Sequence, residues 1–172
     1  MKVLLSVVGA LAVSACTYQD TRYHSRPVFD AGLVAWSYKA GANSVTGSAA
    51  HKTLMGDNRS CSELPIRLIP DSAYARLRFQ ELYGSDAGGA STGPGFNMYG
   101  PEKADPRYLE AVRTAKCDAQ GKFSFTDVAD GVWYVLSVDN QLGQTSNATT
   151  WGSAAFKRLE LRNGQAVEVT LP

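Results

Sequence analysis

The sequence has little of what most enzyme and nucleic-acid-binding sites are built from. Of its 172 residues two are histidines, His24 and His51, which restricts both metal ligation and general-base catalysis. It contains neither a phosphate-binding loop nor an HExxH pattern. With 17 Lys and Arg against 16 Asp and Glu, the formal net charge is +1, so the basic excess that attracts nucleic acid is missing. These absences leave no catalytic set, metal site, cofactor or nucleic-acid partner in evidence.

The apolar run at the start of the chain is too short to span a membrane as a helix. It covers residues 3–13, whereas a spanning helix needs about 20 residues. Lys2 precedes this run, whose length is typical of the h-region of a signal peptide. We therefore predict a signal peptide at residues 1–15.

The segment that follows, Val13-Ser14-Ala15-Cys16, resembles a bacterial lipobox. In such proteins the cysteine sulfur carries a diacylglyceryl group and the new amino terminus is usually acylated, which anchors the protein in a membrane. The resemblance implies a membrane partner through lipidated Cys16 and a place in the bacterial cell envelope. Because Thr17 follows rather than Asp, it favours the outer membrane, facing the periplasm. An ordinary secretory signal with a chance cysteine is the alternative. We predict a tether at residues 16–31 and a folded domain at 32–172.

Two cysteines, Cys61 and Cys117, remain for the folded domain. They could form a disulfide, contribute to a metal site or include a nucleophile. Neither belongs to a CxxC motif or comes with a histidine pair, and an exported protein folds in an oxidising compartment. A disulfide is therefore favoured, closing a loop of about 57 residues and stabilising the fold by about 4 kcal/mol.

The first half of the domain carries both strand and helix patterns. Alternating apolar residues predict strands at residues 33–38, 44–49 and 63–70. After residue 71 the apolar spacing becomes helical, with Ser72 in position to cap the helix and Gly84 to end it. A strand is the alternative for this segment. The helical stripe consists of Ala75, Phe79, Leu82 and Tyr83.

Residues 84–106 hold six glycines and three prolines, which predicts a long loop. Apolar side chains in such a loop either pack back onto the domain or contact a partner. Asp105 is placed to cap a helical turn at Pro106, and residues 110–115 are expected to form a strand. The candidate partner contacts are Phe96, Met98 and Tyr99 in this loop and Trp151 in a second one.

The stretch after Cys117 predicts two strands joined by short turns. Residues 118–121 have Asp first and Gly fourth, which is typical of a type I turn. Phe123 and Phe125 then alternate with polar residues, and Asp130-Gly131 makes the next turn. Residues 132–138 are almost wholly apolar, as in a strand covered on both faces. We predict that these strands form a meander.

The end of the chain predicts a hairpin around Asn163-Gly164. Leu159 and Leu161 alternate with charged residues before this turn, and apolar residues alternate again at 167–171. A three-residue loop pairs Leu159 with Val167 and places both apolar sets on one face, which a two-residue loop does not. We therefore predict a G1 bulge with Gly164 in the left-handed conformation.

The run CDAQGKFSFTDVADGVWYVLSV, residues 117–138, resembles the carboxypeptidase regulatory-like domain, a transthyretin-like β-sandwich. The resemblance covers about residues 32–172 and implies a mainly β fold with one or two short helices, the glycine-rich loop being an insertion. Members of the family serve as accessory, binding or structural modules, and the resemblance carries over no catalytic residue. Trp133 stands where the family usually has Tyr. The family pattern Asp-x-x-Gly-x-Phe-x-Phe, then Gly-x-Tyr-x-Val, is met here by Asp118, Gly121, Phe123, Phe125, Gly131, Trp133 and Val135.

We therefore expect a lipid-anchored envelope β-sandwich that acts as a binding or structural accessory module. An envelope protein or a glycan is the expected partner, contacted through the loop residues named above. The alternative is an envelope hydrolase or metal-dependent enzyme with a site around His51. That alternative requires His51 to lie beside Cys61, Cys117 or a carboxylate cluster, and nothing in the sequence places it there.

Overall fold

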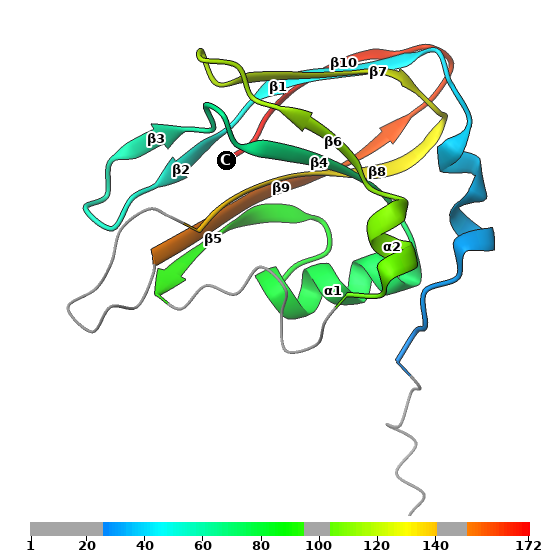
Figure 1. Cartoon of the computed structure of the whole chain (residues 1–172), viewed down its shortest axis with the longest axis horizontal. Coiled ribbons are helices and arrows are strands. Elements are labelled where there is room, and N and C mark those ends of the chain that lie inside the picture. The colour runs from blue at the N-terminus through cyan, green and yellow to red at the C-terminus, as the bar shows by residue number, and fades with distance from the viewer. Residues whose placement is uncertain (1–25, 95–103, 141–150) are drawn as a thin grey trace, which may run out of the picture.

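A computed structural model describes residues 26–94, 104–140 and 151–172 of the chain. Its fold is mainly β (Figure 1). Within the described residues no helix is long and apolar enough to cross a membrane. The elements are, in order, η1 (Ala31–Tyr38), β1 (Asn43–Ser48), β2 (Ala50–Lys52), β3 (Asn58–Ser60), β4 (Pro65–Pro70), α1 (Ala73–Tyr83), β5 (Gly88–Pro94), α2 (Pro106–Glu110), β6 (Arg113–Lys116), β7 (Lys122–Val128), β8 (Gly131–Asp139), β9 (Trp151–Leu161) and β10 (Ala166–Thr170).

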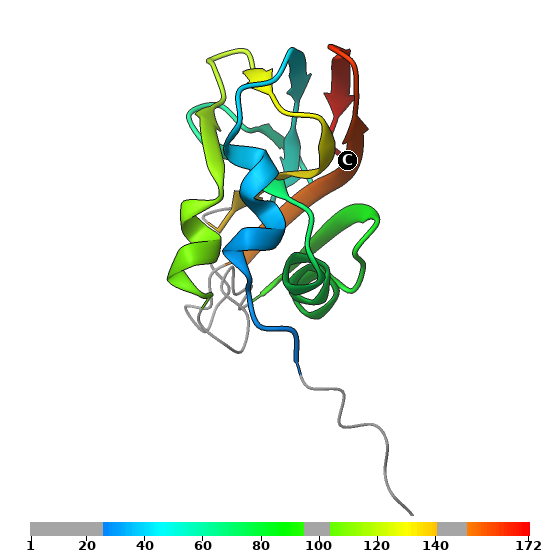
Figure 2. The same ribbon diagram turned by 90° about the vertical axis from the view of Figure 1, so that its right-hand side faces the viewer.

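Two sheets face each other, so the predicted sandwich is confirmed. The smaller sheet has the order β10-β1-β7 and the larger one β5-β9-β8-β4-β6, while β2 and β3 form a separate hairpin. Helices α1 and α2 cover the face of the larger sheet that is turned away from the smaller one (Figures 1 and 2). The domain therefore has three layers and two apolar cores, one between the sheets and one beneath the helices.

Strand β8 separates the two cores and confirms the prediction of a strand covered on both faces. Because side chains alternate along a strand, Trp133 and Val135 enter the core between the sheets, whereas Tyr134 and Leu136 enter the core beneath the helices. All four side chains are buried. The nearly continuous apolar run in the sequence follows from this position.

The predicted caps of both helices are confirmed. The Ser72 hydroxyl accepts a hydrogen bond from the Ala75 amide, and Gly84 ends α1 in the left-handed conformation. The Asp105 carboxylate accepts a hydrogen bond from the Arg107 amide at the start of α2. A glycine fits the end of α1 because it reaches positive φ without a steric penalty.

Residues 33–38, predicted as a strand, belong instead to the 3₁₀ helix η1. The Asp30 side chain caps this helix by accepting a hydrogen bond from the Gly32 amide. Val34 and Ser37 are its buried residues, and their spacing of three matches the three residues per turn of such a helix. The Trp36 indole packs edge-on against Trp133 with ring centroids 5.0 Å apart. The apolar alternation in the sequence was therefore misleading at this segment.

The predicted loop at residues 84–106 is wrong for its first part, because β5 occupies Gly88–Pro94. This glycine-rich strand pairs antiparallel with β9 at the edge of the larger sheet. The small and polar residues of β5 do not show the apolar alternation that predicts a strand. The strand is held instead by backbone pairing with β9. Strand β6 likewise begins at Arg113, later than predicted.

The predicted meander and the predicted final hairpin are both wrong in their pairing. β7 belongs to the smaller sheet and β8 to the larger, and β9 and β10 are divided in the same way. β10 instead runs parallel to β1, with Val167 opposite Val45. Two strands whose apolar faces point into the same core can be neighbours in one sheet or can face each other across the sandwich. The alternation of apolar residues is the same in both cases, so it did not distinguish them. Gly164 does have positive φ, as predicted, and so does Asn163.

The predicted disulfide is present between Cys61 and Cys117, whose Cα atoms are 5.8 Å apart. Cys61 follows β3 and Cys117 follows β6, so the bond joins the hairpin β2–β3 to the edge of the larger sheet. Both cysteines are buried in the core between the sheets.

Candidate functional site

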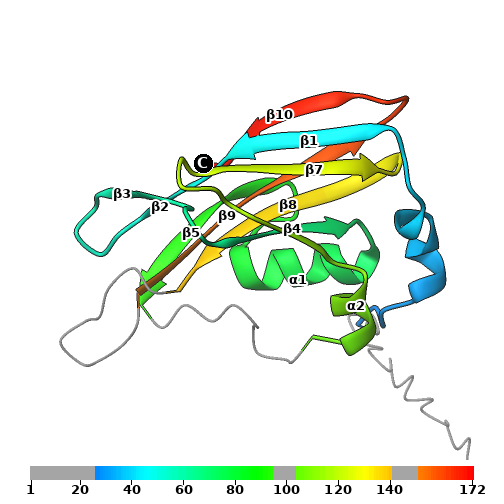
Figure 3. The same cartoon turned by 45° about the horizontal axis from the view of Figure 1, so that its top comes forward.

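A cavity of about 310 Å³ lies between α1, α2 and the outer face of the larger sheet. Figure 3 shows the two helices beside each other next to β4. This volume is near the lower end of the range for small-molecule sites. Side chains from β4, α1, α2, β6 and β8 line it, among them Arg67, Arg78, Phe79, Tyr83, Tyr108 and Leu136.

The floor of the cavity is a row of side chains that crosses three strands. Arg67 of β4 pairs with Thr114 of β6 on one side and with Leu136 of β8 on the other. Since side chains alternate along β4, Ile66 and Leu68 enter the core between the sheets and Arg67 points to the opposite face. A charged side chain thus lies on an otherwise largely apolar sheet surface.

Helix α1 forms one wall of the cavity and is held by aromatic packing. Phe79 stacks on Tyr134 of β8 with ring centroids 4.1 Å apart and an angle of 17° between the rings. It also contacts Phe156 of β9 at 4.8 Å. Tyr83 extends this cluster and lies 5.3 Å from Phe156. Such packing in a buried core fixes the side chains in single rotamers, so the wall is preformed.

The guanidinium of Arg78, also on α1, lies over two aromatic rings. Its Cζ is 5.8 Å from the ring centroid of Tyr74 and 5.9 Å from that of Tyr108. Cation–π contacts of this kind orient the guanidinium and keep its charge in place. The Tyr108 ring in turn packs edge-on against Phe29 at 5.7 Å.

Both arginines act on the hydroxyl of Tyr83. Burial raises the pKa of Tyr83 to about 12, while the positive charges of Arg67 and Arg78 lower it. Burial also raises the pKa of Tyr108, again opposed by Arg78. Both phenols are therefore protonated at neutral pH. Their hydroxyls can donate hydrogen bonds in a corner of the cavity that has positive potential.

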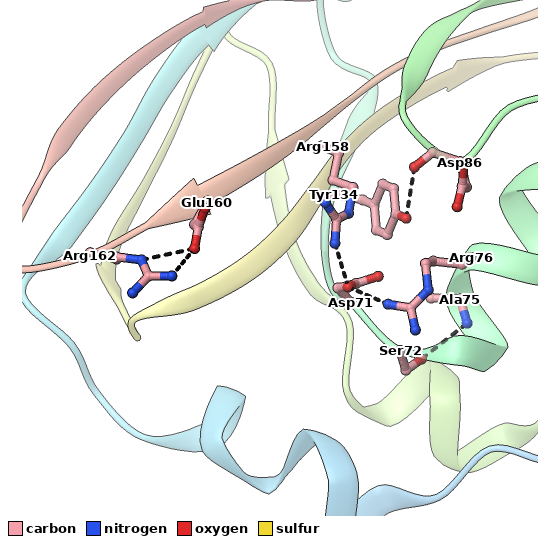
Figure 4. Close-up of polar contacts among 9 residues, drawn as sticks. All are labelled: Asp71, Ser72, Ala75, Arg76, Asp86, Tyr134, Arg158, Glu160 and Arg162. Carbon is pink, nitrogen blue, oxygen red and sulfur yellow. Dashed lines mark hydrogen bonds and ion pairs between the residues drawn. The ribbon is translucent and has the colours of Figure 1, made fainter.

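None of the described residues that line the cavity is acidic. Three carboxylates of the neighbouring elements are paired with other arginines. Asp71 accepts from Arg76 at 2.6 Å and from Arg158 at 2.8 Å (Figure 4). In the same way Glu81 pairs with Arg26 at 2.5 Å, and Asp105 with Arg107 at 2.7 Å.

A second polar feature lies in the core between the sheets, at the end that the β2–β3 hairpin covers. Its members are buried: His51 of β2, Ser137 and Asp139 of β8 and Ser153 of β9. Asp139 is opposite Ser153 in the β8–β9 ladder. Arg59, opposite His51 in the hairpin, lies 3.4 Å from Asp139. The hairpin thus closes this end of the sandwich with charged and polar groups.

His51 is held by a hydrogen bond of 2.8 Å between its Nε2 and Ser137 Oγ. Its Nδ1 is buried and has no hydrogen-bond partner among the described residues. Burial lowers the pKa of His51; the Asp139 charge opposes this and the Arg59 charge adds to it. The ring is therefore neutral at pH 7.

The His51 cluster does not have the geometry of a catalytic triad. A triad needs an acidic side chain bonded to Nδ1 and an accessible serine, whereas here Nδ1 lacks a partner and Ser137 is fully buried. Nor do the described residues include three or more His, Cys, Asp or Glu placed to hold a metal ion. His51 thus lies near a carboxylate, as the enzyme alternative requires, but in a closed core.

The sequence also contains a Gly-x-Ser-x-Gly match at residues 89–93. A nucleophile elbow needs this pattern at a sharp turn from strand to helix. Here it lies within β5, where Ser91 pairs with Ala154 of β9. The match is therefore part of an edge strand.

The other predicted site residues fall largely outside the described part of the chain. Cys16, Phe96, Met98 and Tyr99 lie outside it, and so does the side chain of Trp151. The backbone of Trp151 begins β9 and pairs with Pro94 at the end of β5. The two predicted contact segments are therefore connected to neighbouring strand ends.

No pattern in the sequence marks the cavity residues as a site. One signal was present, because Arg67 interrupts the apolar run Leu64-Pro65-Ile66-Arg67-Leu68-Ile69. A charged residue in a strand with both faces covered marks a place where one face opens. No comparable feature of the sequence marks Arg78, Tyr83 and Tyr108 as cavity residues.

No family model matches the chain, and no curated protein matches it. Among solved structures, the chain is similar to a Pseudomonas aeruginosa protein described as a candidate carbohydrate-binding protein. The TM-score is 0.66 at 21% sequence identity, covering 84% of this chain and 97% of that one. The likeness shows a shared fold.

Proposed function

We propose that the protein is a lipid-anchored binding module of the bacterial cell envelope. The observation that carries this proposal is the preformed cavity between α1, α2 and the larger sheet. Aromatic and apolar walls with a few converging polar groups are typical of small-molecule sites. The carbohydrate-binding description of the structural neighbour supports a glycan or a related ligand.

The proposed anchor is Cys16, after removal of residues 1–15, and the resemblance to a lipobox supports it. Thr17 favours the outer membrane, with the domain in the periplasm. Phe29, within the predicted tether, is buried between Tyr74 of α1 and Tyr108 of α2. The tether would therefore join the domain beside the cavity, which would place a bound ligand on the side of the anchor.

The binding proposal can be tested by filling the cavity. Thr114 is exposed on the edge strand β6 and lines the cavity, so Thr114→Trp should occupy the site without disturbing the core. Thr46→Trp, at an exposed position of β1 in the other sheet, is the matched control. Calorimetric titration with a panel of envelope monosaccharides and disaccharides should show binding that Thr114→Trp abolishes. Equal binding by both variants would contradict the proposal.

The anchor is tested separately by the intact mass of the protein purified from membranes. We expect loss of residues 1–15 and a mass increase from acylation at Cys16, and Cys16→Ala should release the protein from the membrane fraction. A native protein that keeps its first fifteen residues, or that carries an unmodified Cys16, would refute this part of the proposal.

The segment with Phe96, Met98 and Tyr99 stays a predicted contact surface for an envelope protein. It is followed directly by Ala104, which lines the cavity. Crosslinking from membranes before and after deletion of residues 95–103 would test it, and an unchanged set of partners would speak against it.

A further inference from the structure

We propose that the cavity binds a carboxylate attached to a compact ring-shaped body, with Arg67 and Arg78 holding the carboxylate. This inference rests on the proposed binding function and specifies its ligand. It follows from which hydrogen-bonding groups line the cavity, how the arginines are placed, and how large the space is.

The polar groups of the lining are mainly donors. Arg67 and Arg78 can donate hydrogen bonds but cannot accept them. Tyr83, Tyr108 and Thr114 contribute hydroxyls, and no described lining residue supplies a carboxylate or an amide oxygen from its side chain. Each hydroxyl of a neutral polyol also brings a donor hydrogen, and among the described lining side chains the hydroxyls of Tyr83, Tyr108 and Thr114 are the groups that can accept one. A ligand rich in acceptors matches this lining better.

Arg67 is placed as a binding group. Its side chain has no ion pair or hydrogen bond with any residue of the described ranges, although nearby carboxylates are paired with other arginines. It lies between Thr114 and Leu136 in the register of the sheet, and all three residues line the cavity. A guanidinium fork in a partly apolar site binds carboxylate through two parallel hydrogen bonds.

The second arginine, Arg78, lines the same cavity. Arg67 and Arg78 come from different elements, β4 and α1, and both lie close enough to Tyr83 to act on its hydroxyl. The rings of Tyr74 and Tyr108 orient Arg78. Two guanidiniums and a phenol therefore line the same cavity, which suits an anionic group.

The rest of the ligand is limited by the apolar part of the cavity. Ile69, Phe79, Leu82 and Leu136 line it together with the faces of the tyrosines. A volume of about 310 Å³ accommodates a ring of six atoms with its substituents, and not an extended polymer. Two sources share this chemistry: a sugar acid, such as a uronic acid, and an aromatic or alicyclic carboxylic acid.

The test uses two pairs of probes that differ mainly in charge: glucuronate with glucose, and benzoate with benzamide. Calorimetric titration of the mature full-length protein should show that the anion of at least one pair binds at least about tenfold more tightly than its neutral partner. Binding by glucuronate alone identifies a sugar acid, and binding by benzoate alone identifies an apolar acid. Binding by both supports the shared carboxylate chemistry.

Variants connect this binding to the cavity. Arg67→Gln should weaken binding of the anion by about 10- to 100-fold, because a charge-assisted hydrogen bond is lost. Arg67→Lys keeps the positive charge but loses the two parallel donors, so its affinity for the anion should lie between those of the wild type and Arg67→Gln. Arg162→Gln is the matched control, since Arg162 pairs with Glu160 away from the cavity (Figure 4). Thermal denaturation of each variant confirms that it is folded.

Two results would overturn the inference and leave the binding function in place. One is equal binding of the charged and the neutral probes that is lost in Thr114→Trp. The other is no binding of any of the four probes while the glycan panel still binds in a way that Thr114→Trp abolishes. If neither the probes nor the panel binds, both proposals fail. Anion binding that Arg67→Gln leaves unchanged also refutes the assigned site.

Discussion

Acid should destabilise this fold through His51. Burial lowers the folded-state pKa of His51. The negative charge of Asp139 raises this pKa, and the positive charge of Arg59 lowers it further. The unfolded chain therefore binds a proton more readily than the folded one as the pH falls below about 6.5. The free energy of unfolding is not affected by His51 above that pH and decreases below it, until the folded-state pKa is reached.

The expected loss follows from proton linkage. One histidine contributes at most about 1.4 kcal/mol per pH unit to the slope of stability against pH. If the folded ring stays neutral, the loss relative to pH 8 reaches about 1.4 kcal/mol at pH 5.5. The buried Nδ1, which has no described partner, is the structural reason to expect that the folded ring resists protonation. A charged ring would need a second acceptor there.

The measurement is urea unfolding at pH 8.0 and pH 5.5 for the wild type and for His51→Gln, which keeps an amide donor near Ser137. The difference in stability between the two pH values should be smaller in the variant, by up to about 1.4 kcal/mol. His24→Gln, which changes the other histidine of the chain, should behave like the wild type. If the wild type and His51→Gln show parallel pH dependence, the burial argument for His51 is refuted.

Three further changes test the fold. Replacing Cys61 and Cys117 together by Ala should lower the free energy of unfolding by about 4 kcal/mol in the chain-entropy model, because the bond spans a sequence separation of 56; a loss below about 1 kcal/mol in urea unfolding would show that the bond constrains little. Ser72→Ala should cost about 1 kcal/mol through loss of the α1 cap, and an unchanged denaturation midpoint would disprove the cap. Gly131→Ala should be among the more damaging substitutions, since its Cβ would lie 2.3 Å from an indole atom. The control Gly56→Ala also has positive φ but has no atom within 4 Å of the added carbon, so equal melting temperatures of these two variants would refute the steric reason.

Much of the local structure was predictable because it depends on neighbours in the chain. Ser72, Gly84 and Asp105 cap helices through groups a few residues away, and the apolar run at 132–138 required cover on both faces. The segment 33–38 shows the limit of such patterns. Its side chains alternate as in a strand, but the Asp30 cap and the contact of Trp36 with Trp133 hold a 3₁₀ helix.

The candidate site was much less predictable than the elements that build it. Arg67 stands out in an apolar strand, yet its neighbours Thr114 and Leu136 are set by strand pairing. His51 was known to be the single histidine of the domain and had no predicted place. The β2–β3 hairpin puts it beside Ser137 and Asp139, far away in the sequence. No local pattern contains that information.

The sequence by itself determined most of the extended segments and their apolar faces, though neither η1 nor β5, and it determined where α1 and α2 begin and which cysteines are left to pair. The tertiary structure decided which strands are neighbours, and so it moved β7 and β10 into one sheet and β8 and β9 into the other. The physical reason is that the alternation of side chains fixes which face of a strand turns toward the core. It does not fix the neighbour, because any strand with a matching apolar face can lie beside it in the same sheet or across the core in the other sheet. The cavity and the buried His51 cluster depend on that choice, which is made by the packing of the whole domain.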